Sequence, residues 1–275
     1  MRTQQANELM QTSFDVVIMG GGLAGLTLAR QLRMQREQTT ILVVEKNQHP
    51  VPEAAHKVGE STVEAGTYYL REVIGLKELL EESHLIKVGL RFFLSYEDNA
   101  DIERRFEFGS LHAPPVPSHQ LDRGRLENQL ASLNQQMGIC FLDNASITDI
   151  ELGDPRHTVV VQRAGASQSI EARWLIDATG LTTLLKRKLK LGKPSDHSCN
   201  AVWFRMDAVI NAHHWSDDKA FRVKVPEDSR RLSTTHLMGN GYWVWLIPLS
   251  SGGTSVGIVA DSNAHPISRL VLPDE

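Results

Sequence analysis

The run Phe14-Asp-Val-Val-Ile-Met-Gly-Gly-Gly-Leu-Ala-Gly25 sets the architecture of this chain. Its first six residues are mostly apolar and β-branched, which is typical of a buried parallel strand. Glycines follow at once, and apolar residues with helical spacing continue from Leu23 to Arg36. A strand, a glycine-rich turn and a helix in this order predict the start of a βαβ unit.

The glycines of this run match a dinucleotide-binding motif. Gly20 permits a sharp turn out of the strand, Gly22 lets the backbone approach a pyrophosphate, and Gly25 lets helix and strand pack closely. The helix then begins at Leu23 and Ala24, where unpaired N–H groups and the helix dipole would face the phosphates. The alternative is an ordinary glycine turn in an α/β domain.

An acidic residue at the end of the next strand strengthens the dinucleotide interpretation. Thr39 to Glu45 reads as a second buried strand, and Glu45 lies about twenty residues past the motif, where an acid binds a ribose hydroxyl. A carboxylate there disfavours a 2′-phosphate, and hence NADP. We group Lys46, the next residue, with the expected cofactor contacts.

The middle of the chain mixes helices and strands. A helix is expected from Ser61 or Thr62 to Glu82, with Ser61 and Glu64 as a capping box and Gly75 as a point where the helix could divide. Strands are expected at 88–96 and 102–108, and another helix at 122–136.

The remaining segments are rich in expected strands. A strand pair is predicted at 147–151 and 158–163, a further strand at 169–173 leads into Trp174–Asp177, and a hairpin joins 242–249 to 254–260. The fold class is therefore α/β, a Rossmann-like dinucleotide-binding domain with an added β-sheet region. We expect the first domain at 1–190, interrupted by strands around 88–108, and the sheet region at 191–275.

Composition limits the classes of partner. The net charge is −4 and the pI is about 6.3, so neither nucleic acid nor an anionic membrane is indicated as a partner. Cys140 and Cys199 match no metal spacing, and neither do His213, His214 and His236. No apolar run is long enough to cross a bilayer. A metal-free cytoplasmic protein with reduced thiols is expected.

Three motifs together resemble the FAD-binding domain shared by aromatic-ring hydroxylases, geranylgeranyl-reductase-like enzymes and flavin-dependent halogenases. They are Gly20–Gly25, Arg123 within Asp122-Arg-Gly-Arg-Leu-Glu127, and Asp177-Ala-Thr-Gly180. The resemblance implies FAD as cofactor. It places Arg123 at the phosphates or ribityl chain, and Asp177 and Gly180 where a strand closes against the flavin.

Three further segments resemble the halogenases in particular: Lys57-Val-Gly-Glu-Ser-Thr62, Lys87-Val-Gly-Leu-Arg-Phe92 and Trp243-Val-Trp-Leu-Ile-Pro248. In that family, reduced FAD, O₂ and halide yield hypohalous acid, which reaches a lysine beside the substrate. The resemblance implies that Lys87 is this lysine, with Lys57 as the next candidate, and that Glu60 and Ser61 face the isoalloxazine. Without the resemblance, Lys87 reads as a surface lysine at a strand start.

The resemblance also implies partners: a small aromatic substrate and a separate flavin reductase. Trp243 and Trp245 alternate on one strand and share a face, either as core or as a wall near the flavin. A further family segment, a Gly-Asp pair before a Pro-Gly loop, has no counterpart before Glu275, so the chain is expected to be C-terminally incomplete. Open alternatives are a flavin monooxygenase, an isoprenoid-type reductase, or a catalytically incomplete fragment that binds a nucleotide weakly or not at all.

Overall fold

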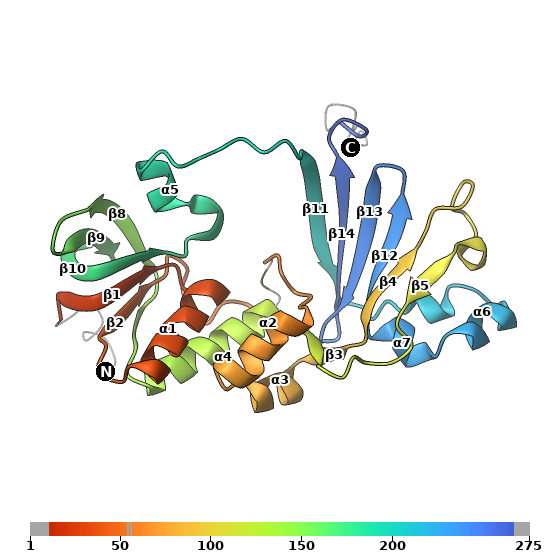
Figure 1. Ribbon diagram of the computed structural model, residues 1–275, viewed down its shortest axis with the longest axis horizontal. Coiled ribbons are helices and arrows are strands. Elements are labelled where there is room, and N and C mark those ends of the chain that lie inside the picture. The colour runs from red at the N-terminus through yellow and green to blue at the C-terminus, as the bar shows by residue number, and fades with distance from the viewer. Residues whose placement is uncertain (1–10, 54, 56, 267–275) are drawn as a thin grey trace. The chain divides into compact units, whose positions relative to one another are not determined.

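A computed structural model describes residues 11–53, 55 and 57–266. The chain divides into two compact units (Figure 1). The first comprises Met1–Ala55 and Gly124–Lys193, and the second comprises His56–Arg123 and Pro194–Glu275. Each unit is built on its own six-stranded sheet.

The first unit contains the expected parallel strands. Its sheet has the order β7-β2-β1-β10-β9-β8, in which β1, β2, β7 and β10 run parallel and β8 and β9 are antiparallel additions. The strands are β1 Ser13–Met19, β2 Ile41–Val44, β7 Cys140–Leu142, β8 Ala145–Glu151, β9 His157–Arg163 and β10 Ala166–Asp177. The helices are α1 Leu23–Gln35, α4 Arg123–Gln136 and α5 Leu184–Lys188.

Both faces of strand β1 are buried, which explains its continuous apolar run. Val17 and Met19 belong to one core cluster, whereas Val16 and Ile18 belong to a second cluster that also contains Ala29 of α1. The alternation of a strand sends these two pairs to opposite faces of the sheet. The strand therefore carries α1 on one face and delivers Gly20 to the carboxyl edge.

The second unit has a sheet of order β11-β14-β13-β12-β4-β5, in which only β4 and β12 pair in parallel. The strands are β4 Gly89–Phe93, β5 Glu107–Gly109, β11 Cys199–Met206, β12 Ser233–Gly239, β13 Tyr242–Pro248 and β14 Thr254–Asp261. A two-stranded ladder joins β3 Leu85–Lys87 to β6 Ser118–Gln120. Short helices α6 Lys219–Lys224 and α7 Glu227–Arg231 complete the unit.

The helix expected from residue 61 to Glu82 is broken. It consists of α2 Glu64–Tyr68, a π-helical turn at Tyr69–Val73, and α3 Lys77–Ser83. Gly75, with φ of 66°, lies between the last two, as its left-handed backbone permits. The predicted capping box is wrong: Val63 is the N-cap residue, without a side-chain cap, and Ser61 hydrogen-bonds to Thr234 instead, Oγ to Oγ1 at 2.7 Å.

The strand expected at 102–108 is mostly not a strand. Ile102–Arg104 forms a 3₁₀ turn, and only Glu107–Gly109 pairs with β4. Because β4 also pairs with β12, the segment 56–123 joins the second unit, whereas the sequence suggested that only residues around 88–108 interrupt the first domain. No described helix combines the length and the apolar character needed to cross a membrane.

Candidate cofactor and substrate sites

Two glycines of the turn after β1 are required by the protein's own packing. Gly20 has φ of 112°, and a Cβ there would lie 2.3 Å from the carbonyl oxygen of Ala178. A Cβ at Gly25 would lie 2.0 Å from the carbonyl oxygen of Gly20. Real side chains do not tolerate such contacts, so the strand, the turn and α1 can approach each other only with glycine at both positions.

Gly22 is different, because a Cβ there would meet no described atom within 4 Å. Gly22 is the N-cap of α1, where no side chain caps the helix and no acidic residue occupies the first turn. Leu23 begins the helix, and Ala24 is exposed beside it. The space in front of the helix is therefore open and faces N–H groups and the positive end of the dipole, which suits a phosphate.

Glu45, at the end of β2, is buried and holds this turn in place. Its Oε2 accepts a 2.7 Å hydrogen bond from the Gly21 N–H, and its Oε1 accepts bonds from the backbone and side chain of Asn47 at 2.8 and 2.7 Å. Lys46 is exposed at the next position. The carboxylate thus lies under the glycine turn. A contact between Glu45 and a ribose hydroxyl stays a prediction.

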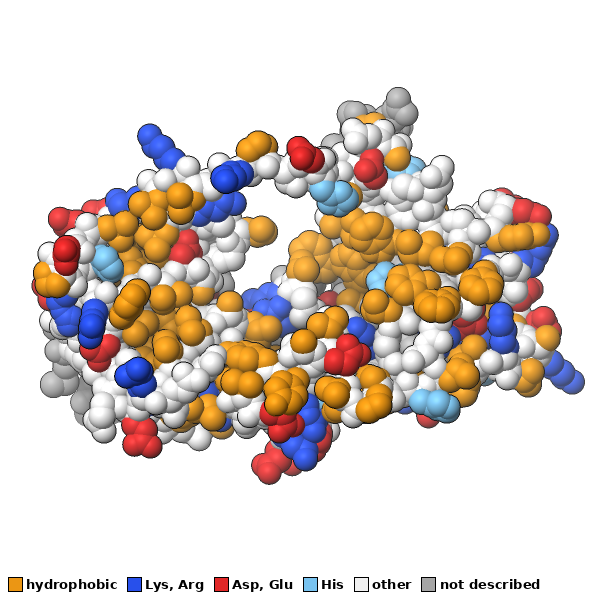
Figure 2. Space-filling model, viewed as in Figure 1, with side chains coloured by type: hydrophobic (Ala, Val, Ile, Leu, Met, Phe, Trp, Pro, Cys, Tyr) orange, Lys and Arg blue, Asp and Glu red, His pale blue; other side chains and the backbone are white. Residues whose placement is uncertain are grey.

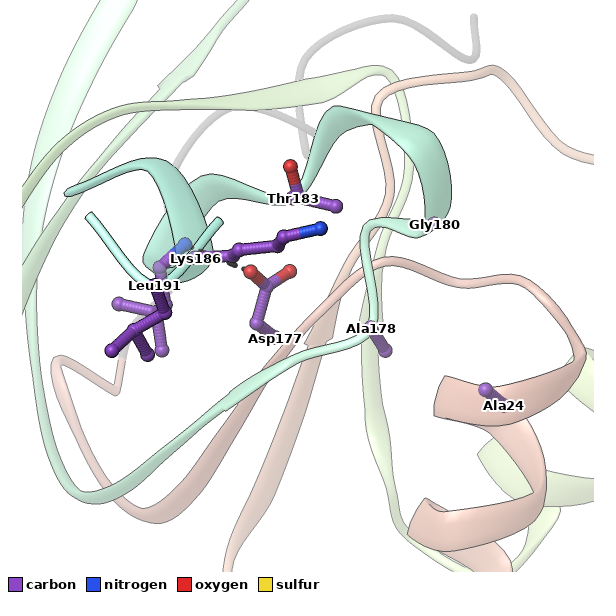
Figure 3. Close-up of a pocket in the computed structure, with 8 residues that line it drawn as sticks. Ala24, Asp177, Ala178, Gly180, Thr183, Lys186 and Leu191 are labelled. Carbon is purple, nitrogen blue, oxygen red and sulfur yellow. Dashed lines mark hydrogen bonds between the residues drawn. The ribbon is translucent and has the colours of Figure 1, made fainter. Parts of the chain in front are cut away.

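A cavity of about 470 Å³ opens beside the start of α1 (Figure 3). Its lining includes Ala24 together with residues that follow β10, namely Asp177, Ala178, Gly180, Thr183, Leu185, Lys186 and Leu191. In Figure 3 the side chain of Lys186 extends across the carboxylate of Asp177, and the chain at Gly180 turns above Ala178. The sequence motifs Gly20–Gly25 and Asp177–Gly180 therefore meet at one cavity.

The carboxylate of Asp177 organises the loop that follows it. It accepts hydrogen bonds from the Thr179 hydroxyl at 2.5 Å, the Thr179 N–H at 3.1 Å and the Leu185 N–H at 2.8 Å. Burial alone raises the pKa of Asp177, but these bonds outweigh it and leave the pKa below its ordinary value. Asp177 is thus an ionised residue that ties α5 to the end of β10.

In the second unit, two basic side chains hold the loop Val58–Thr62. Arg123 donates from Nη1 to the Val58 carbonyl at 2.5 Å, and Lys87 donates from Nζ to the Thr62 carbonyl at 2.6 Å. Between these points Glu60 is buried and Ser61 is half-buried. The structure therefore gathers four residues of the sequence prediction, Glu60, Ser61, Lys87 and Arg123, around one loop.

Lys87 is the most deeply buried lysine of the described chain, with 3% of its surface exposed. Burial lowers its pKa, and the Glu64 carboxylate offsets this only in part. The alternative of a surface lysine at a strand start is wrong, because the side chain points inward from the end of β3. Lys57, the second candidate, is half-buried in the loop.

Sequence reasoning missed the residue that pairs with Glu60. Arg205 of β11 contacts Oε1 of Glu60 at 2.8 Å through Nη2, and Oδ1 of Asp122 at 3.1 Å through Nη1. All three side chains are at most 9% exposed. No local pattern marks Arg205, which occupies one position of an alternating strand, so only the fold reveals this pairing.

A second cavity, of about 240 Å³, lies against the sheet of this unit. Its walls come from the loop and four strands: Val58, Gly59, Glu60, Ser61, Leu90, Trp203, Thr234, His236, Trp245 and Ile247. Figure 2 shows hydrophobic side chains gathered over this sheet. Trp245 forms part of the cavity wall and donates from Nε1 to the Ser255 hydroxyl at 3.3 Å. Among described residues, no cluster of three or more His, Cys, Asp or Glu side chains suits a metal.

Known proteins are similar to this chain over most of its length. Residues 13–260 match the family described as FAD binding domain. The flavin-dependent halogenase chlA of Dictyostelium discoideum is 28% identical over 274 residues, covering 89% of this chain and 44% of that protein. A 1H-pyrrole-2-carbonyl-[peptidyl-carrier protein] chlorinase of Pseudomonas fluorescens is 28% identical, covering 95% of this chain and 59% of that protein.

Solved structures agree on the fold. The halogenase PltM in complex with phloroglucinol and FAD superposes with a TM-score of 0.75 at 21% identity, over 92% of this chain and 52% of that one. A flavoprotein/dehydrogenase from Cytophaga hutchinsonii gives a TM-score of 0.70 at 23% identity, over 91% and 56% of the two chains. The chain spans about half the length of the relatives it matches.

Proposed function

Because this chain belongs to the FAD-binding-domain family and is distantly homologous to flavin-dependent halogenases, we propose that it is an FAD-dependent oxidoreductase that halogenates a small aromatic molecule. Reduced FAD, when bound, would give two electrons to O₂ and the halide would give two more, so that O₂, the halide and the protons yield hypohalous acid and water. A separate flavin reductase is the proposed source of reduced FAD.

The residues around the glycine turn fit a dinucleotide. The open space at Gly22 and the uncapped start of α1 would hold the pyrophosphate, with Leu23, Ala24 and Gly25 supplying backbone. The Glu45 carboxylate accepts hydrogen bonds from Gly21 and Asn47 and has further lone pairs. Through these it would accept a hydrogen bond from a ribose hydroxyl. Glu60, Ser61 and Arg123 of the second unit are proposed as further cofactor contacts.

The observation that carries halogenation is the buried amine of Lys87 with its lowered pKa. An uncharged amine can hydrogen-bond hypohalous acid, or exchange an N–H hydrogen for the halogen and release water. Transfer of the halogen to an aromatic carbon then returns the ring proton to the nitrogen. Burial favours this role because it lowers the protonated fraction and excludes water.

Cofactor binding is the first test. The purified chain is passed through a desalting column and its flavin absorbance per mole of protein is measured. Near-stoichiometric FAD supports the proposed contacts. No flavin, with none regained from excess FAD, contradicts FAD binding by this chain.

Activity is the second test. The chain receives FAD, a flavin reductase with NADH, O₂ and chloride or bromide, and phenol, indole and pyrrole are examined by mass spectrometry. We expect a halogenated product that disappears in Lys87→Ala and persists in Lys57→Ala, the matched control. A hydroxylated product unaffected by Lys87→Ala would indicate a monooxygenase and contradict the proposal.

A further inference from the structure

One row of side chains crosses the whole sheet of the second unit. The registers of neighbouring strands place each member directly opposite the next, in the order Phe108, Phe92, His236, Trp245, Gly257 and Trp203. Residues paired in this way point to the same face of a sheet. Five of the six members are aromatic, counting the imidazole, and the sixth has no side chain.

Gly257 leaves a gap in the row because it has no side chain. A Cβ at this position would lie 2.2 Å from Cζ2 of Trp245, so the indole of Trp245 occupies the space above Gly257. The Trp245 Nε1–H bond to Ser255 fixes that orientation. The ring thus lies over β14 toward Trp203 of β11, and both tryptophans line the cavity of about 240 Å³.

His236 brings a polar group into this aromatic wall. Its ring stacks on Phe92, with centroids 5.0 Å apart and planes 21° apart, and it lines the same cavity. Its Nδ1 atom is buried and has no hydrogen-bond partner among the described residues. Nδ1 therefore remains without a hydrogen bond from the described residues, while the backbone carbonyls of Thr234 and Arg91 also act on the ring.

The surroundings of His236 favour the uncharged imidazole. Burial lowers the pKa of His236, and Lys87, whenever it is protonated, lowers it further, whereas the Thr234 and Arg91 carbonyls raise it. A neutral imidazole has one nitrogen that accepts a hydrogen bond. A hydrogen-bond acceptor within an aromatic wall suits an aromatic ligand that carries a hydrogen-bond donor.

We propose that the sheet side of the cavity, bounded by Trp203, His236 and Trp245, binds a planar aromatic ring bearing an O–H or N–H group, that His236 pairs with this group, and that Gly257 sets the width of the slot. Glu60 and Ser61, which line the cavity from the loop Val58–Thr62, remain the proposed cofactor contacts. This inference rests on the proposed function for its identification of the ligand as the substrate. When an acceptor forms a hydrogen bond with the O–H or N–H of such a ring, the electron density of the ring increases. An electrophilic halogen attacks electron-rich rings.

The experiment measures binding without turnover. Dissociation constants of 4-fluorophenol, 5-fluoroindole and 4-fluoroanisole are obtained by ¹⁹F NMR titration of the purified chain, with neither halide nor reductant present. The wild-type chain is expected to bind 4-fluorophenol or 5-fluoroindole more tightly than 4-fluoroanisole, which has no hydrogen-bond donor. His236→Phe, which keeps a ring against Phe92, is expected to reduce that preference by about two- to tenfold.

A matched glycine pair tests the slot. Gly257→Ala is expected to weaken binding of the preferred ring by at least about fivefold, because the indole of Trp245 must move. Gly66→Ala, where a Cβ meets nothing within 4 Å, is expected to leave binding unchanged. Trp203→Leu, on the edge strand β11, replaces Gly257→Ala as the test if that variant does not fold.

The outcomes separate this inference from the proposed function. Equal binding of phenol, indole and ether by the wild-type chain, or unchanged binding in Gly257→Ala and Trp203→Leu, overturns the inference even if the chain halogenates. Selective binding that depends on His236 and Gly257 supports it even if no halogenated product forms, in which case the proposed function is what fails.

Discussion

Nη2 of Arg205 lies 2.8 Å from Oε1 of Glu60, and both side chains are buried. The same guanidinium contacts Asp122, so one cation offsets two carboxylates that water cannot solvate. Burying a charge is unfavourable unless it is paired. The position of the loop Val58–Thr62, which forms one wall of the cavity of about 240 Å³, therefore depends on a residue of β11, an edge strand of the sheet.

Removal of this cation should destabilise the protein strongly. We expect Arg205→Met to lower the free energy of unfolding by about 3–5 kcal/mol, because two buried carboxylates lose their counter-charge. Urea unfolding followed by circular dichroism measures it. The control is Arg231→Met, which removes an exposed ion pair to Asp228 and should cost less than about 1 kcal/mol. Equal losses in the two variants would show that the buried pairing does not support the unit.

The stability of the protein should respond differently to alanine at two glycines of the motif. Gly25→Ala is expected to lose about 1–3 kcal/mol or more of stability, because its Cβ meets the Gly20 carbonyl at 2.0 Å. Gly22→Ala, with φ of −80° and open space around it, should stay within about 0.5 kcal/mol of wild type. FAD affinity of Gly22→Ala should nevertheless fall, by about tenfold or more.

This pair separates a structural glycine from a ligand-binding one. Thermal unfolding without cofactor gives the stability, and a flavin fluorescence titration gives the affinity. Wild-type FAD affinity in Gly22→Ala would contradict the assignment of the open space to the pyrophosphate.

The buried amine of Lys87 should reduce stability at neutral pH. Because burial holds its pKa below the ordinary 10.5, the folded state disfavours the charged form, and this penalty disappears as pH rises from the folded pKa to 10.5. Wild type should therefore gain stability relative to Lys87→Met as the pH is raised through that window. Urea midpoints across the alkaline range measure the difference, with Lys46→Met as an exposed control. A constant difference between wild type and Lys87→Met at all pH values would contradict a shifted amine.

Asp177 should contribute stability with the reverse pH dependence. Its pKa is depressed below the ordinary 3.8, so its contribution is present above pH 3.8 and is lost as pH falls through the folded pKa. We expect Asp177→Asn to cost about 1 kcal/mol at neutral pH, since the amide accepts the Thr179 and Leu185 bonds more weakly. The cost should shrink in acid, as thermal melts over that range would reveal. An acid-independent cost would mean that the carboxylate charge is not what holds α5.

Much of the first unit could be predicted because its signals are local. The apolar run before Gly20, the glycine spacing and the acid at Glu45 each reflect contacts within one βαβ unit. Predictions failed where a distant contact overrode a local preference. Ser61 has the spacing of a helix cap, but it bonds to Thr234 instead. In the segment 102–108, Ile102–Arg104 forms a 3₁₀ turn, and Arg105 donates hydrogen bonds to the distant carbonyls of Phe93 and Met238.

The sequence by itself determined the α/β class and the cofactor turn, because motifs and periodicity are properties of neighbouring residues. Lys87 became a candidate only through the resemblance of its segment to the halogenases. Only the tertiary structure decided which side chains complete the second unit. Arg205 reaches Glu60 across 145 positions and Asp122 across 83, and Trp203, Trp245 and His236 form one wall only through the register of β11 to β14. Register and long-range pairing arise from packing the whole sheet at once, so no short stretch of sequence encodes them.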